Sequence, residues 1–500
     1  MRTIPPNVAS EGSGRLGVMT EYDAVIGLEC HVELSTETKM FCGCRNSFGA
    51  PPNTNVCPVC LGHPGSLPVP NREAIRRIIT IGLALGSEIA PHSLFHRKNY
   101  FYPDMPKNFQ ISQYDLPICV GGHLDVELPD GTSRVGITRV HMEEDTGKTT
   151  HASSSGRIHD ADAALVDFNR AGVPLVECVS EPDIRSPEEA GAYLRELRAT
   201  LESLDVSDVR MEEGSLRCDA NISMRPVGTK AFGTKVEIKN MNSVRSLERA
   251  LVYEIARQTK ALEAGQPIVQ ETRHWNEDAG ATATMRSKEE AFDYRYFPEP
   301  DIPAMEPAAE WIEELRAALP ELPRARRDRY VGELGLKPEV ARVLVGDRAA
   351  CVLFEGTAAL GSDPVAVANW VTQDLAGFAN KHGLEAAARA TPRHLADVLS
   401  LLADDRISGA GAKQALEEVV ETGDDIDAIV ERRGLRQVSD SGELGAIIDQ
   451  VLVDNADAAT KFRSGNEGVI GFLVGQVMKA SGGSANPKLA QDLLRERLQS

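Results

Sequence analysis

The 500-residue sequence has no apolar run close to the roughly 20 residues that a membrane-spanning helix needs. Its first residues lack the apolar segment of a secretory signal peptide, so we expect neither a membrane protein nor a secreted one. Basic residues are outnumbered, with 54 Lys and Arg against 74 Asp and Glu and a net charge of −20. Because so acidic a chain is a poor general binder of polyanions, any contact with nucleic acid must be local.

Common hydrolase motifs are missing as well. The chain has no H-E-x-x-H, no G-x-S-x-G and no Gly-Ser-Ser-Gly run of an amidase. No cysteine lies in the G-x-C-x-G setting of a common glutaminase. The chain therefore has none of the usual motifs of a self-contained amidase or glutaminase.

Nine cysteines, an odd number in a long chain, argue against a disulfide scaffold and favour the reducing cytoplasm. Four of them form a pattern of two short pairs: Cys42, Cys44, Cys57 and Cys60. Two thiolate pairs joined by a loop rich in Pro and Gly can close a tetrahedral shell around Zn²⁺. Four cysteines leave no open coordination position, so the predicted role is structural. The alternative is four unligated core cysteines.

The texture of the sequence predicts an α+β fold. We expect residues 1–20 to be a flexible lead-in and residues 21–303 to form a domain in which short β-branched runs alternate with two clear helices. Residues 304–352 are expected as a helical linker, and residues 353–500 as a helical region with a possible split near 423–434.

Both helices of the first region have start signals. Ser186 is a predicted N-cap, with Pro187 at the first helical position and Glu189 completing a capping box. The second helix is predicted from about residue 243 to 264, where Gly265 ends it.

Acidic residues recur at the ends of apolar β runs in the first region. Glu29, His31 and Glu33 share one face of a predicted strand, and further acids follow in 141–145 and 173–177. Carboxylates held together repel one another, so a divalent cation is the expected resolution. Oxygen ligands with one imidazole suit Mg²⁺ or Mn²⁺ better than Zn²⁺.

Basic residues are interleaved with these acids, and beside a bound Mg²⁺ several would suit the phosphates of ATP. The candidates are Lys98, Lys235, Lys239, Arg286 and Arg295. Each of these residues, taken alone, is more often a solvated surface group. The aromatic residues of 100–102 and 294–297 are either core or a stacking surface for adenine.

Together these segments resemble the B subunit family of aspartyl/glutamyl-tRNA amidotransferase. The matching segments are 25–34 (VIGLECHVEL), 97–104 (RKNYFYPD), 111–115 (ISQYD), 141–145 (HMEED), 180–187 (SEPDIRSP), 211–221 (MEEGSLRCDAN), 293–301 (DYRYFPEPD) and 471–479 (GFLVGQVMK). The resemblance covers residues 21–500, and its motifs are specific to the family.

The resemblance implies a glutamine-synthetase-like catalytic domain, a helical domain and a small tail that contacts tRNA. It implies a heterotrimer in which an A subunit releases ammonia from glutamine and a C subunit wraps the pair. The B subunit would then act as an ATP-dependent carbon–nitrogen ligase on misacylated Glu-tRNA(Gln) or Asp-tRNA(Asn). It would phosphorylate the side-chain carboxylate, and ammonia would displace the phosphate.

The resemblance also implies roles for named residues. The family's magnesium ligands fall on Glu29, His31, Glu144 and Glu177, and its zinc cysteines on Cys42, Cys44, Cys57 and Cys60. One departure is Cys30, where valine is usual. It is expected to point away from the metal face.

The tail reverses the charge of the chain. Residues 461–500 hold six basic and three acidic residues, a net charge of +3, which suggests a tRNA-backbone contact at Lys479 and Lys488. Two alternatives stay open. One is a non-catalytic tRNA-binding scaffold with a zinc module, and the other is an independent ligase for a small acid and free ammonia.

Overall fold

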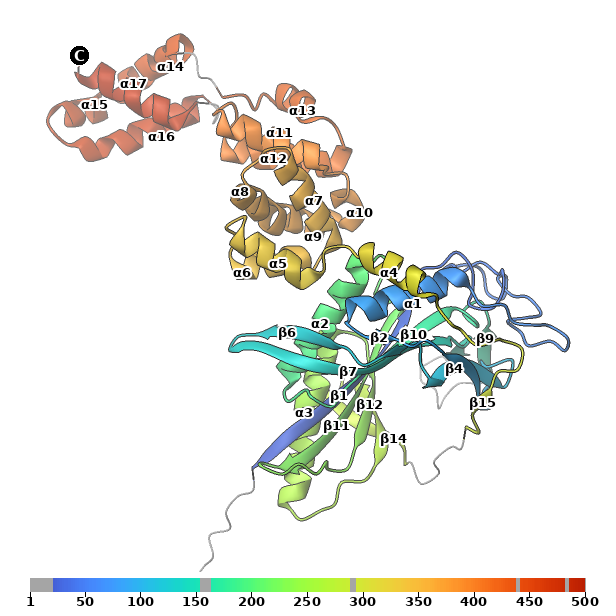
Figure 1. The fold of residues 1–500 in the computed structure, drawn as a ribbon. Helices are drawn as coiled ribbons and strands as arrows, with labels where there is room; N and C mark the ends of the chain where they lie inside the picture. The colour runs from blue at the N-terminus through green and yellow to red at the C-terminus, as the bar shows by residue number, and fades with distance from the viewer. Residues whose placement is uncertain (1–20, 153–162, 288–293, 438–440, 482–484, 500) are drawn as a thin grey trace, which may run out of the picture. The chain divides into compact units, whose positions relative to one another are not determined.

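The computed structural model describes residues 21–152, 163–287, 294–437, 441–481 and 485–499. The chain forms two compact units, Met1–Leu322 and Pro323–Ser500. The first unit is rich in sheet and the second is helical (Figure 1), so the predicted α+β class is confirmed.

A large, mostly antiparallel sheet organises the first unit. Its strands follow the order β14-β13-β12-β11-β1-β10-β7-β4-β3-β15, and β12 and β13 run parallel. These strands are β1 (Tyr22–Glu33), β3 (Leu94–Asn99), β4 (Phe109–Leu116), β7 (Gly131–Glu144), β10 (Pro174–Ser180), β11 (Leu216–Pro226), β12 (Val236–Met241), β13 (Glu271–Asn276), β14 (Ala281–Ser287) and β15 (Phe297–Pro298). Short strands β2 (Glu88–Ile89), β5 (Cys119–Val120) and β6 (His123–Leu128) join the same sheet, and β8 (Lys148–Ala152) pairs with β9 (Ala163–Asp167).

The helices of the first unit are α1 (Arg72–Ala84), α2 (Pro187–Ser203), α3 (Val244–Glu263) and α4 (Ala309–Ala317). Helices α2 and α3 are the two predicted from the sequence, and Ser186 and Ser243 cap them through their hydroxyl groups. The predicted capping box is wrong in one detail. The Glu189 carboxylate accepts from the backbone N–H of Arg185 at 2.7 Å, instead of that of Ser186.

Strand β1 lies inside the sheet, and its two faces differ. Ile26 and Cys30 are fully buried in the core, among side chains of α2 and α3, which lie together on one face (Figure 1). Cys30 therefore points into the core, away from His31. Glu29, His31 and Glu33 alternate with these residues and lie on the opposite face. The sheet thus has an apolar face and a polar face, and the polar face presents candidate catalytic groups.

Residues 304–352, expected as a linker, are shared by the two units. Leu315 of α4 is buried in the core of the first unit. Tyr330 and Leu344, by contrast, are fully buried in a core of the second unit. The division of the chain falls between Leu322 and Pro323.

The second unit is built on two separate hydrophobic cores, and the change from one to the other falls between Leu435 and Leu444. The helices of the first core are α5 (Pro323–Gly332), α6 (Pro338–Val345), α7 (Arg348–Ala359), α8 (Pro364–Asn369), a π-helical turn (Trp370–Leu375), α9 (Ala376–His382), α10 (Leu384–Ala387), α11 (Pro392–Ala403), α12 (Gly409–Thr422) and α13 (Ile426–Arg433). Those of the second are α14 (Ser441–Asp454), α15 (Ala456–Arg463), a 3₁₀ turn (Glu467–Val469), α16 (Ile470–Ala480) and α17 (Pro487–Gln499).

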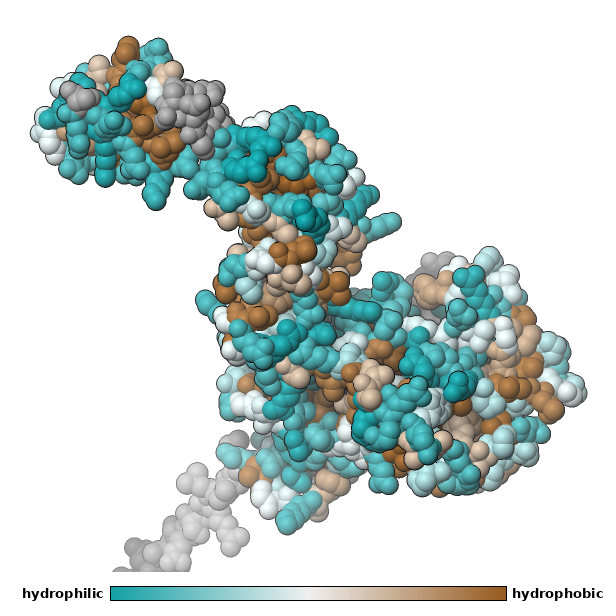
Figure 2. Space-filling view, turned by 45° about the horizontal axis from the view of Figure 1, so that its top comes forward, coloured by the Kyte–Doolittle hydropathy of each residue, from teal (hydrophilic) through white to brown (hydrophobic). Residues whose placement is uncertain are grey.

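Hydrophilic residues cover much of the visible face of the second unit, with hydrophobic patches among them (Figure 2). Across the described ranges, no helix has the length and apolarity that crossing a bilayer requires.

Candidate functional site

Three neighbouring strands bring polar side chains into one row on the polar face. In the register of the sheet, His31 of β1 faces Glu177 of β10, which in turn faces His141 of β7. The Glu177 Oε2 atom lies 3.6 Å from His31 Nε2 and 3.5 Å from His141 Nε2. Glu143, two residues beyond His141 on the same face, approaches the His141 Nε2 atom to 3.4 Å.

His31, Glu143 and Glu177 form a group able to hold a metal ion, which we call the cation group. Each can offer one ligand atom, and these atoms lie within 4.8 Å of one another. Two carboxylate oxygens and one imidazole nitrogen are a donor set that accepts Mg²⁺ or Mn²⁺. Beside this group, both ring nitrogens of the fully buried His141 have no hydrogen-bond partner among the described residues, so this imidazole is a further donor that the protein leaves unused.

The electrostatics of the group favour charged carboxylates. Burial opposes the charge on Glu143, yet the positive charge of Lys98 and the contact with His141 hold its pKa well below the usual range. Burial likewise opposes the charge on Glu177, and His31 and His141 outweigh it and lower the pKa. For His31, burial lowers the pKa, but the hydrogen bond and charge of Glu177 raise it more. The two carboxylates thus keep the negative charge that a divalent cation would need.

Glu144, a ligand implied by the resemblance, lies outside this group. Neighbouring residues of a strand point to opposite faces, so Glu144 turns away from the side that carries Glu143. Its carboxylate pairs with the Lys107 ammonium and accepts the backbone N–H of Ile111 at 2.9 Å. Both partners of the ion pair are nearly fully buried, so Glu144 is committed to a structural contact.

Glu29 is on the same face as His31 but is not part of the three-residue group. Its Oε1 atom accepts from the Asn221 side-chain amide at 2.7 Å. The two residues line a hollow in the surface together with Lys235. The structure therefore brings together two of the four implied ligands, His31 and Glu177, and adds Glu143. The alternation in 141–145 could have identified Glu143, because it places Glu143 on the face of His141.

The five predicted phosphate-binding residues lie in different surroundings. The Lys98 ammonium lies 5.2 Å from the centroid of the Tyr294 ring. Lys239 pairs with Asp219 and Glu237, whose charges raise its pKa against the opposing effect of burial.

Lys235 is exposed beside the hollow that Glu29 lines. Arg295 is exposed next to Tyr294 and Tyr296. Arg286 belongs to β14, but its side chain lies outside the described part of the structure.

A second charged network adjoins the cation group. The buried Asp145 carboxylate accepts from the Arg217 guanidinium at 2.8 Å, and Arg170 lies 3.5 Å away. Burial, together with the charge and hydrogen bond of Asp145, raises the pKa of Glu33 to about 8. A raised pKa of Glu33 beside a lowered pKa of Asp145 favours a neutral Glu33 next to an ionised Asp145 at neutral pH.

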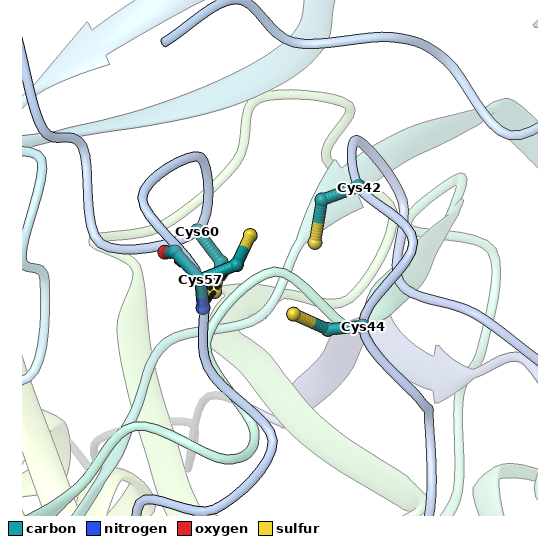
Figure 3. A group of neighbouring side chains, drawn as sticks. All are labelled: Cys42, Cys44, Cys57 and Cys60. Carbon is teal, nitrogen blue, oxygen red and sulfur yellow. Dashed lines mark hydrogen bonds between the residues drawn. The ribbon is translucent and has the colours of Figure 1, made fainter.

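The four cysteines of the predicted zinc module converge (Figure 3), with their sulfur atoms within 4.8 Å of one another. The backbone N–H of Cys57 donates to the Cys60 sulfur at 3.1 Å. A hydrogen bond from Cys42, which outweighs burial, lowers the pKa of Cys60 to about 4. Four converging cysteine sulfurs are the donor set of a structural zinc site, which binds them as thiolates.

A buried lysine anchors the loop that carries these cysteines. Lys39 is fully buried, and its ammonium donates to the carbonyl oxygens of Asn55 at 2.7 Å and Phe168 at 3.3 Å. Asn53 adds a backbone bond to the Asp167 carboxylate at 2.9 Å. The cysteine loop is thus tied to the segment that follows β9.

The two predicted tRNA contacts lie on neighbouring helices of the second unit. Lys479 is exposed in the last turn of α16, and Lys488 is exposed in the first turn of α17. The intervening residues 482–484 lie outside the described residues.

Comparisons with known proteins agree over nearly the whole chain. The family described as "GatB/GatE catalytic domain" matches residues 24–313, and that described as "GatB domain" matches residues 352–498. Three similar proteins are each named as the B subunit of an aspartyl/glutamyl-tRNA(Asn/Gln) amidotransferase.

The protein of Brevibacillus brevis is 51% identical over 96% of this chain and 100% of its own length. That of Carboxydothermus hydrogenoformans is 52% identical over 96% of this chain and 99% of its own length. That of Moorella thermoacetica is 53% identical over 96% of this chain and 100% of its own length.

Proposed function

The chain belongs to the B subunit family of aspartyl/glutamyl-tRNA(Asn/Gln) amidotransferase, and we propose that it carries out the ATP-dependent step of that reaction. The observation that supports this most is the buried group of His31, Glu143 and Glu177 on the polar face of the sheet. The polar face, with helices behind the other face, is also what a glutamine-synthetase-like catalytic domain needs.

The reaction requires activation because a carboxylate has no leaving group for attack by ammonia. ATP transfers its γ-phosphoryl group to the side-chain carboxylate of Glu-tRNA(Gln) or Asp-tRNA(Asn), which gives an acyl phosphate and ADP. Ammonia then forms the new carbon–nitrogen bond, phosphate leaves, and the amide remains. Phosphoryl transfer spreads negative charge over several oxygens, which positive groups must offset.

His31, Glu143 and Glu177 would hold Mg²⁺, with Glu29 nearby on the same face. Bound there, Mg²⁺ supplies positive charge to the ATP phosphates. Lys98, Lys235, Lys239, Arg286 and Arg295 remain the proposed phosphate-binding residues. Lys98 fits this role best among them, because its charge already acts on Glu143.

The four cysteines fit a structural Zn²⁺, since all four donors converge and no fifth protein ligand is needed. Zinc would hold the 42–60 loop in place against the segment after β9. The four cysteines and their zinc would take no part in the reaction.

The chain would work in the cytoplasm in a heterotrimer with an A subunit, which supplies ammonia from glutamine, and a C subunit. The exposed Lys479 and Lys488 would contact the tRNA backbone. This arrangement explains why the chain lacks a glutaminase motif of its own.

The test uses the complete heterotrimer and the variant His31→Ala. We expect tRNA-dependent ATP hydrolysis to fall by about 100-fold or more, because one of three cation ligands is lost. Hydrolysis of glutamine by the partner should remain. Unchanged ATP turnover would instead favour the non-catalytic scaffold.

A further inference from the structure

An aromatic and cationic stack lies beside the cation group. The rings of Tyr114 in β4 and Tyr296 stack with centroids 5.4 Å apart and planes 21° apart. The guanidinium carbon of Arg139 lies 4.4 Å from the Tyr114 centroid. Tyr114 also meets the His141 ring edge to face, at 6.2 Å and 83°. The stack therefore touches the same histidine that contacts Glu143 and Glu177.

Arg139 shares the face of the cation group. In the register of β7 with β10, Arg139 faces Val179, and His141 faces Glu177. Residues two apart on a strand point the same way, so the Arg139 side chain leaves β7 on the side of His141. Its distance from His141 along the strand is about 7 Å.

Arg139 differs from Arg217 and Lys239 of this face, because it has no acidic partner among the described residues. Arg217 pairs with Asp145, and Lys239 pairs with Asp219. Across the described ranges, no carboxylate forms an ion pair with Arg139, and its Nε atom is buried without a hydrogen-bond partner. A partly buried cation without a counter-ion is costly, and an incoming anion would remove that cost.

The support behind Arg139 is itself held in place. The side-chain amide of Asn99 donates to the carbonyl oxygens of Tyr294 at 3.2 Å and Arg295 at 2.8 Å. Arg295 has a φ of +44°, a left-handed conformation that costs energy for a side chain of this kind. These contacts fix the turn from which Tyr296 reaches Tyr114, so the ring over which the Arg139 guanidinium lies is supported before any ligand arrives.

We propose that Arg139, oriented by Tyr114, is a further substrate-binding residue that receives an oxyanion next to the cation group. The inference rests on the proposed function. Two oxyanions of that reaction suit a planar guanidinium, which can donate two parallel N–H bonds. One is the side-chain carboxylate of the aminoacyl-tRNA, and the other is the phosphoryl group transferred from ATP. Tyr114 acts through Arg139 and is a positioning residue.

The test compares variants of Arg139 with a matched control in the complete heterotrimer. Arg198 in α2 also has a buried Nε without a hydrogen-bond partner, but α2 packs against the other face of the sheet. Arg139→Gln should lower kcat/KM for amidation by roughly 10- to 100-fold, the effect of losing a charged hydrogen bond. Arg139→Lys should recover only a small part, because an ammonium lacks the planar fork. Arg198→Gln should stay within about threefold of the wild type.

Two substrate arms identify the oxyanion. If it is the carboxylate, Arg139→Gln weakens binding of Glu-tRNA(Gln) and not of the product Gln-tRNA(Gln), which lacks the charge, and KM for ATP is unchanged. If it is the phosphoryl group, binding of both tRNAs is unchanged, and kcat for tRNA-dependent ADP formation falls. Either result supports the proposal.

Tyr114 supplies the conservative rescue. Tyr114→Phe keeps the ring and should behave as the wild type, whereas Tyr114→Leu should lower the same parameter as Arg139→Gln by about 3- to 10-fold. If the ring were only structural, Tyr114→Leu would instead lower the melting temperature and affect all substrates alike.

The inference is overturned if Arg139→Gln has the same kcat/KM for amidation as Arg198→Gln. It is also overturned if Arg139→Gln lowers the melting temperature and weakens the binding of ATP and of both tRNAs to the same extent. Failure of the proposed function looks different. In that case the wild-type heterotrimer itself shows no ATP-dependent amidation.

Discussion

Two clusters of the first unit can hold a cation, and the chain assembles them in opposite ways. The four cysteines come from residues 42–60, a single loop. His31, Glu143 and Glu177 come from three strands and meet only because β10 lies between β1 and β7 in the sheet. A cluster within one loop can stabilise that loop, whereas a cluster on a rigid sheet can hold charges ready for a reaction. Damage to the first should therefore cost stability, and damage to the second should cost activity.

The largest effect is expected at Glu143. Glu143→Gln should lower ATP-dependent amidation by roughly 100- to 1,000-fold, because it removes a carboxylate that would face the cation and the phosphates. The melting temperature should fall only modestly, since relief of repulsion with Glu177 offsets part of the lost attraction to Lys98 and His141. Steady-state ADP formation and a thermal melt check the two parts.

The neighbouring variant Glu144→Gln sharpens this contrast. It should destabilise the protein by about 3 kcal/mol, because it leaves the Lys107 ammonium buried without its partner. The opposite result would be an active Glu143→Gln variant and an inactive but fully stable Glu144→Gln variant. It would place the cation on the other face of β7.

The cysteine cluster should show the opposite pattern. Cys57→Ser should lower zinc content from about one equivalent and reduce the free energy of unfolding by about 2 to 4 kcal/mol, because metal binding stabilises the folded loop. The turnover of the protein that remains folded should change far less. Metal analysis, denaturant unfolding and activity per folded molecule measure these effects. Wild-type protein that contains no zinc after purification without chelators would show that the four cysteines do not bind it.

A smaller effect is expected from Glu33, in the pH dependence of the free energy of unfolding. The pKa of Glu33 is raised to about 8 in the folded protein, so the folded state binds the proton more tightly than the unfolded one. The stability that this residue contributes is fully present below the pKa of Glu in the unfolded chain, about 4.3, and is lost as the pH rises toward 8. Glu33→Gln keeps a neutral side chain and should flatten this decline. Denaturant unfolding at pH 5, 6.5 and 8 measures it, and an unchanged slope would argue against a raised pKa of Glu33.

The smallest effect is expected in the second unit, outside both clusters. Lys479→Ala should lower tRNA affinity uniformly and reduce the salt dependence by about one unit of slope, as the loss of one phosphate contact does. Neither stability nor KM for ATP should change. Filter binding at several salt concentrations tests this, and an unaltered slope would place the tRNA elsewhere.

Much of the local structure could be predicted from the sequence. Ser186 and Ser243 were expected to start helices and do so, because an N-cap depends on a few adjacent residues. The cysteine pairs could be recognised for the same reason. The partner of Glu189 could not, because Arg185 and Ser186 offer backbone N–H groups only one residue apart, and the local turn selects between them.

The choice between Glu143 and Glu144 shows where prediction from the sequence ends. Both are acidic, adjacent and buried, so composition and hydropathy do not separate them. The period of two in a strand relates Glu143 to His141, but which face meets His31 and Glu177 depends on the pairing of β7 with β10. Arg139 was missed as a candidate because its distinguishing property, the absence of an acidic partner, exists only in the folded protein.

The sequence by itself determined the α+β class, the helix starts, the cysteine pattern and the family, because each is recorded in neighbouring residues or in long matching segments. The tertiary structure decided which acids meet, which of them pair with Lys107 or Arg217, and that Arg139 has no acidic partner among the described residues. The physical reason is that charge interactions act through space. Strand register brings residues distant in the chain within a few ångströms, while alternation sends neighbours in the chain to opposite faces.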